Sequence, residues 1–234
     1  MNYVIAPEVF TKHPDYVRGV VVGRGVANPP EAPAEALALL RTAESLVRIR
    51  PDLNELALHD RIANWRMAYA AFGARPSKYL SSIEALTRRV RKGEPLRVPS
   101  TLVALANAVS LHYLVPVGAH DAGQARTALC LRPARGDETF LPLGETQVER
   151  PEPGEIIYVD GDVVICRRWT WRQAQHTAMR PETSHVAVNV DGLPPVTRAE
   201  TLAICGELAE LIRRFCGGEV AVELLERDHP AIEV

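Results

Sequence analysis

The order of helical and strand patterns is the sequence feature that most limits how this chain can fold. Apolar residues recur at helical spacing over residues 34–50, 60–72, 81–93 and 100–112, whereas most segments after Val115 are short β-branched runs. Helices and strands are therefore largely segregated along the chain instead of alternating. This order predicts an α+β fold built in layers and argues against a doubly wound parallel sheet.

Local signals mark where several of these elements begin and end. Ser81 with Glu84, and Thr197 with Glu200, fit the capping-box pattern that opens a helix. The second of these helices is expected to stop at residues 217–218. Asp160-Gly161-Asp162 separates two β-branched runs, which is typical of a tight hairpin. We predict strands at residues 3–10, 17–22, 155–159, 163–167, 185–190 and 220–225, with a turn at 191–192.

A proline-rich segment at residues 28–33 breaks any regular element. A length of 234 residues suits one large domain with a small extension. We therefore predict an N-terminal extension over residues 1–55, packed on a body that spans residues 56–234.

Composition and missing motifs exclude several classes of protein. No apolar run approaches the roughly 20 residues of a membrane span, and Met1–Phe10 does not look like a secretory signal, so the cytoplasm is expected. No P-loop, G-x-S-x-G, H-E-x-x-H or C-x-x-C is present. Residues 20–27 imitate a dinucleotide-binding turn, but Asn28-Pro29-Pro30 prevents a helix from starting there. No metal or other cofactor is therefore expected. The cysteines, 130, 166, 205 and 216, are interpreted as small apolar residues.

Basic residues are concentrated although the whole chain has a net charge of −2. Residues 61–97 hold nine Lys or Arg against two Glu, and residues 161–180 hold four Arg against one Asp. One basic face that contacts a phosphate backbone would explain this clustering, and so would an ordinary solvated helix surface.

The hexapeptide Arg167–Arg172 interleaves arginines with two tryptophans after a predicted strand. Such a pattern suits stacked bases and phosphates. It also fits a strand that turns Trp169 and Trp171 toward the core and its arginines outward. A second segment, Pro116–Asp121, places His120 and Asp121 at the end of an apolar strand, where catalytic groups often lie.

Asn107 lies on a helix that is apolar nearly all round, so its amide needs a partner in the core or a ligand. Glu84 has the residue type of a general base, but its place in the capping box favours a structural role.

The chain resembles a known family over about residues 59–195. It is similar to the editing domain of the bacterial phenylalanyl-tRNA synthetase β subunit, the B-three/B-four domain, in its freestanding form. The segments that carry the resemblance are Trp65–Gly73, Ser81–Leu86, Leu102–Leu111 with Pro116–Asp121, and Cys166–Arg172.

The resemblance implies a layered α/β body with a β-sandwich of the synthetase editing-domain type. It also implies hydrolysis in trans of a mischarged aminoacyl-tRNA, with tRNA as the partner and neither DNA nor a membrane. An aminoacyl ester is already activated, so water that is positioned and polarised by the site can suffice for its hydrolysis. Water assisted by the terminal ribose hydroxyl is the attacking group that the family suggests.

Family positions transfer unevenly to this sequence. The asparagine of the buried helix matches Asn107, and matching the family pattern on both Pro116 and Asp121 puts Gly118 where the synthetase has a histidine. His120 then replaces an aromatic residue, and the glutamate that reads the tyrosine hydroxyl falls near Gln173. The amino acid removed is therefore left open.

Three groups of candidate residues follow. His120, Asp121 and Asn107 are the catalytic candidates. The substrate-binding candidates are Gly118, Ser82, Trp169, Trp171, Arg172, Gln173 and His176. The RNA-binding candidates are Arg66, Lys78, Arg88, Arg89, Arg91, Lys92, Arg167 and Arg168. The alternatives are a tRNA-, RNA- or amino-acid-binding module without turnover, and a hydrolase of a free amino-acid ester or amide.

Overall fold

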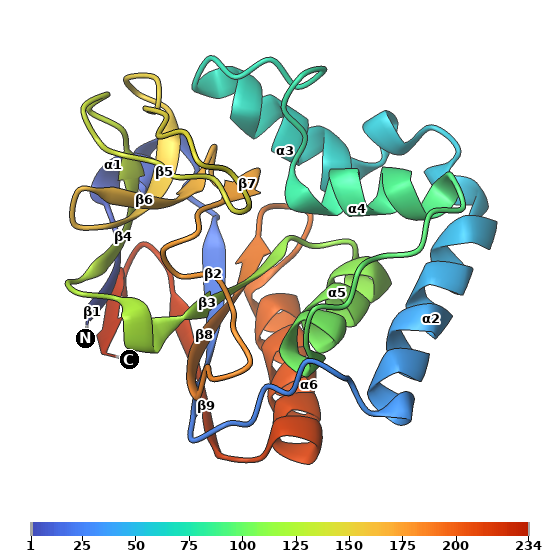
Figure 1. The fold of residues 1–234 in the computed structure, drawn as a ribbon. Coiled ribbons are helices and arrows are strands. Elements are labelled where there is room, and N and C mark those ends of the chain that lie inside the picture. The colour runs from blue at the N-terminus through green and yellow to red at the C-terminus, as the bar shows by residue number, and fades with distance from the viewer. Residues whose placement is uncertain (1, 234) are drawn as a thin grey trace.

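The computed structural model describes residues 2–233, which form six α-helices and two β-sheets (Figure 1). The predicted α+β class is confirmed. The helices are α1 (Pro7–Lys12), α2 (Ala34–Ile49), α3 (Asp60–Ala71), α4 (Ser82–Arg91), α5 (Thr101–Tyr113) and α6 (Arg198–Cys216). Short 3-10 turns occupy Pro51–Leu53, Leu56–Leu58 and Ala122–Gln124.

The first sheet has the strand order β10-β1-β4-β5-β6-β7 and the second has the order β3-β8-β2-β9. Their bounds are β1 (Asn2–Ile5), β2 (Val17–Arg24), β3 (Val117–Asp121), β4 (Leu129–Pro133), β5 (Ile156–Asp160), β6 (Val163–Arg167), β7 (Arg172–Gln173), β8 (His185–Gly192), β9 (Glu219–Leu225) and β10 (Ala231–Glu233). Strands β1 and β4 pair in parallel, and the other ladders are antiparallel.

The elements stack in layers, with the two sheets on one side of the molecule and the large helices on the other (Figure 1). Apolar residues of both sheets, such as Tyr3, Val20 and Tyr158, share one core. The opposite face of the second sheet packs against α5 and α6. A third core joins α2, α4 and α5. The second sheet is therefore buried on both faces, which explains the nearly continuous apolar sequence of β2 and β8.

Close packing of α6 on β2 depends on a glycine. A Cβ atom on Gly19 would lie 2.1 Å from the Cys205 sulfur, so only glycine lets the helix approach this near. The buried thiol of Cys205 fills the space, and burial raises its pKa to about 12. Cys205 and Cys216 are buried small residues, as predicted, and Cys130 and Cys166 are partly buried.

Both predicted helix caps are confirmed. The Ser81 hydroxyl accepts from the Glu84 amide at 3.4 Å, and the Thr197 hydroxyl accepts from the Glu200 amide at 3.2 Å. The hairpin between β5 and β6 is also present, with Gly161 at φ +61°. These signals act within a few residues, which is why the sequence alone places them correctly.

Some predicted strand bounds are wrong. Residues 3–10 form β1 followed by α1, because Pro7 fits the first turn of a helix and cannot continue a strand ladder. Residues 191–192 are not a turn, since β8 runs on through Gly192 and pairs Asp191 with Arg18. The short strands β4, β7 and β10 were not predicted.

The N-terminal residues supply internal strands to both sheets. Strand β1 lies between β10 and β4, and β2 lies between β8 and β9. Residues 2–24 thus contribute to the centre of the fold, and the division of the chain at residue 55 stays a prediction.

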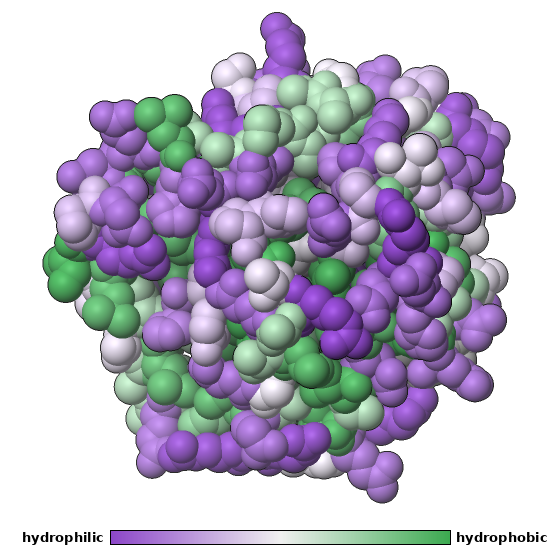
Figure 2. Space-filling model, turned by 180° about the vertical axis from the view of Figure 1, so that it is seen from behind, coloured by the Kyte–Doolittle hydropathy of each residue, from purple (hydrophilic) through white to green (hydrophobic). Residues whose placement is uncertain are grey.

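Polar side chains cover most of the rear face, and apolar ones gather in several separate patches there (Figure 2). No helix within residues 2–233 is long and apolar enough to cross a membrane.

Candidate functional site

A cavity of about 130 Å³ opens where the two sheets meet the start of α4. Its walls come from β2, β3, β5 and β8, from the start of α4, and from the segment between β6 and β7. The lining residues are Arg18, Ser82, Pro116, Val117, Gly118, His120, Tyr158, Cys166, Trp169, Thr170, Trp171, Arg172, Gln173, Asn189 and Asp191.

Seven of the ten predicted catalytic and substrate-binding residues line this cavity: Ser82, Gly118, His120, Trp169, Trp171, Arg172 and Gln173. They come from three segments far apart in the sequence. Asn107, Asp121 and His176 do not line it. The cavity is therefore the candidate site.

Gly118 and His120 lie on one face of β3, two residues apart. The His120 ring is buried, and its Nδ1 lies 2.8 Å from the Thr177 hydroxyl. Burial, and secondarily the charge of Arg18, lowers the pKa of His120 to about 3. The imidazole is therefore neutral at physiological pH. A Cβ atom on Gly118 would have the His120 Nε2 as its nearest neighbour, at 4.0 Å, so the space in front of this glycine is open.

The hexapeptide Arg167–Arg172 forms a turn over residues 168–171, between β6 and β7. The alternative interpretation, a continuous strand, is therefore wrong for these residues. Arg168 and Trp169 have φ values of +46° and +66°, in the left-handed region that residues other than glycine rarely adopt. The Trp169 amide donates to the Ile156 carbonyl at 2.7 Å, and the Arg168 amide donates to the Glu155 carboxylate at 3.2 Å. These bonds hold the turn and leave the tryptophans in different environments.

Trp169 is buried against Tyr16 and Trp65, with ring centroids 4.9 and 5.2 Å away. Trp171 is partly exposed, and its centroid lies 4.9 Å from that of Tyr79. The Arg168 guanidinium lies 3.7 Å from the Tyr79 ring centroid. Trp169 therefore anchors the turn in the core, while Trp171 forms part of the rim.

Hydrogen bonds and an ion pair connect the rim of the cavity to neighbouring elements. The Ser82 amide, in the first turn of α4, donates to the Thr170 carbonyl at 3.0 Å. The Gln173 side chain donates to the Ala119 carbonyl at 2.8 Å. Arg172 is one-third exposed and pairs with Glu145 at 3.0 Å.

The remaining predicted site residues have other partners. Asp121 accepts from the Gly123 amide and from the Thr183 hydroxyl, at 3.0 and 2.7 Å. It follows His120 on a strand and therefore points to the opposite face. His176 bonds Asp160 at 2.8 Å, and Asn107 is partly buried on α5.

The floor of the cavity is a polar cluster that the sequence analysis did not single out. Arg18 is buried and pairs with Asp191 at 2.8 Å, and its Nε also donates to the Tyr16 hydroxyl at 2.9 Å. The Tyr16 hydroxyl bonds Asp191, and the Tyr3 hydroxyl bonds Asn189. The sequence signal that could have indicated this cluster is Arg18 itself, a charged residue inside the apolar run of β2. A buried arginine needs an acidic or polar partner.

The predicted RNA-binding residues divide into four groups, three of arginines and one of lysines. Arg167 and Arg168 are buried and pair with Glu155. Arg66 and Arg88 both bond the buried carboxylate of Glu84, which confirms the structural role of that glutamate. Arg89 is exposed and pairs with Glu94, and the half-buried Arg91 bonds Asn54.

Lys78 and Lys92 are exposed, and neither belongs to an ion pair within residues 2–233. Of the nine basic residues in 61–97, the four arginines 61, 66, 88 and 89 belong to ion pairs, with three glutamates. A direct role in RNA binding is open mainly to these two lysines.

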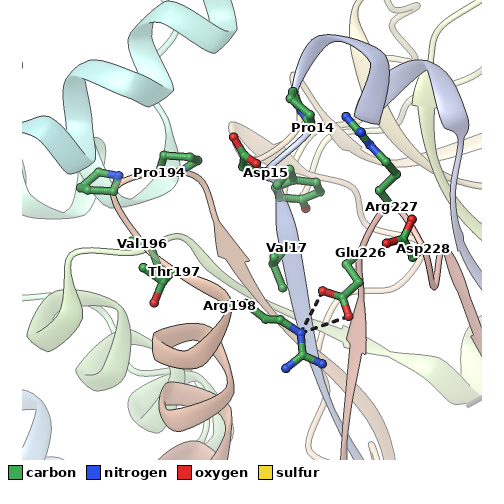
Figure 3. Close-up of a pocket in the computed structure, with 12 residues that line it drawn as sticks. Pro14, Asp15, Val17, Pro194, Val196, Thr197, Arg198, Glu226, Arg227 and Asp228 are labelled. Atoms are coloured by element: carbon green, nitrogen blue, oxygen red, sulfur yellow. Dashed lines mark hydrogen bonds and ion pairs between the residues drawn. The ribbon is translucent and has the colours of Figure 1, made fainter.

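A larger cavity of about 430 Å³ lies between the start of β2, the start of α6 and the end of β9 (Figure 3). Two of its charged groups already pair with each other, since Arg198 bonds Glu226 at 2.9 Å. None of the predicted site residues lines it. Size alone therefore does not favour it over the smaller cavity.

Among residues 2–233, no group of three or more His, Cys, Asp or Glu side chains is placed to hold a metal ion.

Comparison with known proteins identifies the family to which the chain belongs. The B3/4 domain matches residues 64–217, so the chain belongs to the B3/4 (B-three/B-four) domain family. Among solved structures, the chain is similar to an N-terminal fragment of the phenylalanyl-tRNA synthetase β-subunit from Pyrococcus horikoshii, with 11% identity and a TM-score of 0.46. The match covers 93% of this chain and 49% of that fragment, so the chain spans about half of its length. No curated protein matches the chain.

Proposed function

We propose that this protein is a trans-acting deacylase that hydrolyses the ester of a mischarged aminoacyl-tRNA. The observation that carries the proposal is the convergence of Ser82, Gly118 and Trp171 on one small cavity. Its volume of about 130 Å³ suits an amino-acid side chain and is too small for a nucleoside. Membership of the B3/4 domain family supports the same function.

The chemistry of the cavity favours attack by water over covalent catalysis. Cys166 is the thiol that lines the cavity, and burial raises its pKa to about 12, so it remains protonated and unreactive. With Nδ1 bonded to Thr177, His120 can present Nε2 to a water molecule or to the ester. A histidine with a pKa near 3 is a weak base, so its role in this proposal is to position groups. The terminal ribose hydroxyl and the activated ester supply the remaining assistance.

The rim offers a place for the end of the RNA. Trp171 and Tyr79 form a partly exposed aromatic pair on which a terminal base can stack. The Lys78 ammonium lies 5.1 Å from the Tyr79 ring centroid. We expect the phosphates next to the terminal base to lie on this side of the rim.

Filling the cavity tests the proposed activity. Gly118→Leu puts a side chain into the open space of the cavity. Gly118 does not have a positive φ, and an added Cβ atom meets no atom nearer than 4.0 Å, so we expect the fold to be retained. We expect deacylation of the preferred mischarged tRNA to fall by at least about 100-fold, because a displaced ester loses its attack geometry. The measurement is release of labelled amino acid from a panel of mischarged tRNAs.

The matched control is Gly206→Ala on α6, where nothing lies within 4 Å of the added Cβ atom. This variant should keep full activity. If the wild type hydrolyses none of the panel but binds tRNA tightly, the protein is a binding module. Hydrolysis of simple amino-acid esters with no tRNA preference indicates an ester hydrolase instead.

The salt dependence of tRNA binding tests the proposed RNA contact. Lys78→Ala should weaken binding and reduce the slope of log K against log salt concentration by about one. The control is Arg214→Ala on the distant helix α6, where Arg214 bonds Glu35. Equal slopes for Lys78→Ala and the wild type would exclude Lys78 from the interface.

A further inference from the structure

The floor of the candidate cavity has hydrogen-bonding capacity that the protein itself does not use. Arg18 uses Nε and Nη2 on Tyr16 and Asp191, but its Nη1 is buried without a partner among residues 2–233. The Tyr158 hydroxyl is likewise buried without a hydrogen bond of normal geometry in the described chain. Both residues are about 1% exposed, and both line the cavity. Buried polar groups of this kind are costly unless a ligand or an ordered water molecule satisfies them.

The net charge of this floor favours an uncharged ligand group. Arg18 is already neutralised by Asp191, which also lines the cavity. A second carboxylate would face Asp191, and a cation would face Arg18, so each would be repelled at short range. Burial raises the pKa of Tyr158 well above its ordinary value, so its hydroxyl stays neutral.

The volume limits the size of that group. The cavity of about 130 Å³ is smaller than the roughly 150 Å³ space that holds one benzene molecule in a protein interior. Trp169 and His120, both buried, form rigid walls. This volume favours a short side chain over a phenyl or phenol ring.

We propose that Arg18 and Tyr158 are specificity-determining residues that select a short, uncharged side chain carrying an oxygen, a hydroxyl or carboxamide. The inference rests on the proposed function in taking this group to be the side chain of an aminoacyl ester. Arg18 lies outside the residues matched by the family, 64–217, so the N-terminal strand β2 completes the site. The Arg18 Nη1 donates to the side-chain oxygen, and the Tyr158 hydroxyl donates to it or accepts from it.

Binding of isosteric probes tests the proposal without relying on turnover. The probes are 3′-deoxy-3′-threonylamino-adenosine and its valyl counterpart, which are stable amide mimics of a charged tRNA end. We expect the threonyl probe to bind at least about 10-fold more tightly than the valyl probe in calorimetry, because valine leaves both floor groups unpaired. A tyrosyl probe should bind more weakly than the threonyl one. Equal affinity for threonyl and valyl probes, tighter binding of the tyrosyl probe, or binding of none overturns the proposal.

Two variants assign the preference to the floor. Arg18→Lys keeps the charge beside Asp191 but removes Nη1, and Tyr158→Phe removes only a hydroxyl that makes no hydrogen bond of normal geometry within residues 2–233. Both should bring the threonyl-to-valyl ratio toward one. Tyr158→Phe supplies a variant whose folding does not depend on the ion pair. Tyr113→Phe, on the far side of α5, is the matched control and should keep the wild-type ratio. An unchanged ratio in Tyr158→Phe and folded Arg18→Lys contradicts the assignment.

The outcome is separable from the proposed function. A threonyl preference with no hydrolysis of any mischarged tRNA supports the selective floor and refutes the deacylase. Hydrolysis that favours apolar or aromatic amino acids supports the deacylase and refutes the floor. If threoninamide binds as tightly as the adenosine probe, the floor groups still recognise the side chain, but the rim does not contact the adenosine.

Discussion

Arg18→Met is expected to lower the free energy of unfolding by about 3–5 kcal/mol. The substitution leaves the Asp191 carboxylate buried without its cation, and it removes a donor from the Tyr16 hydroxyl. Burial alone would lower the pKa of Arg18, but the neighbouring Asp191 charge outweighs it and holds the pKa well above its ordinary value. The pair is therefore charged in the folded protein, and removal of either partner is costly. Urea denaturation followed by circular dichroism measures the change.

A double variant tests whether the cost of Arg18→Met comes from leaving the Asp191 carboxylate without its cation. Arg18→Met with Asp191→Leu removes both charges together, so it should be more stable than Arg18→Met alone, because no buried charge is left unpaired. Arg214→Met breaks the exposed pair with Glu35 and should cost no more than about 1 kcal/mol. A loss for Arg18→Met as small as for Arg214→Met would mean that the buried pair does not stabilise the fold.

The ion pair between Arg18 and Asp191 could not be predicted from the sequence. Arg18 and Asp191 are 173 residues apart and meet because β2 and β8 pair in a particular register. The sequence analysis placed Asp191 in a turn, so it could not place the carboxylate opposite Arg18. Caps such as Ser81 with Glu84 and the hairpin at Gly161 were predicted correctly because the interacting atoms lie within a few residues of one another.

The candidate cavity was predictable in part for the same reason. The β3 segment with Gly118 and His120, and the segment with Trp171, carry unusual residues that stand out locally. Their convergence came from the resemblance to a family, since no local pattern specifies it. The two successive positive φ values at Arg168 and Trp169 depend on contacts with Glu155 and the core, which a strand pattern does not reveal.

The pH dependence of stability should show that His120 is buried in the neutral form. The pKa of His120 is about 3 in the folded protein against an ordinary value of 6.5, mainly because burial disfavours the charged ring. Between these two values the unfolded chain binds a proton that the folded protein does not. Stability is therefore complete above pH 6.5, falls as the pH drops toward 3, and then levels off. The contribution of His120 to this fall should be about 3 kcal/mol between pH 7.5 and pH 4.5.

His120→Gln isolates that contribution. Glutamine does not titrate and can still bond the Thr177 hydroxyl, so the variant should lose less stability on acidification than the wild type. Other histidines whose pKa is lowered, His13, His59 and His185, are present in both proteins and cancel in the difference. The exposed His112→Gln serves as the control and should follow the wild-type curve. Urea denaturation at half-unit steps from pH 4.5 to 7.5 gives the comparison. Parallel curves for His120→Gln and the wild type would show that the ring is solvated in the folded protein, which contradicts its burial.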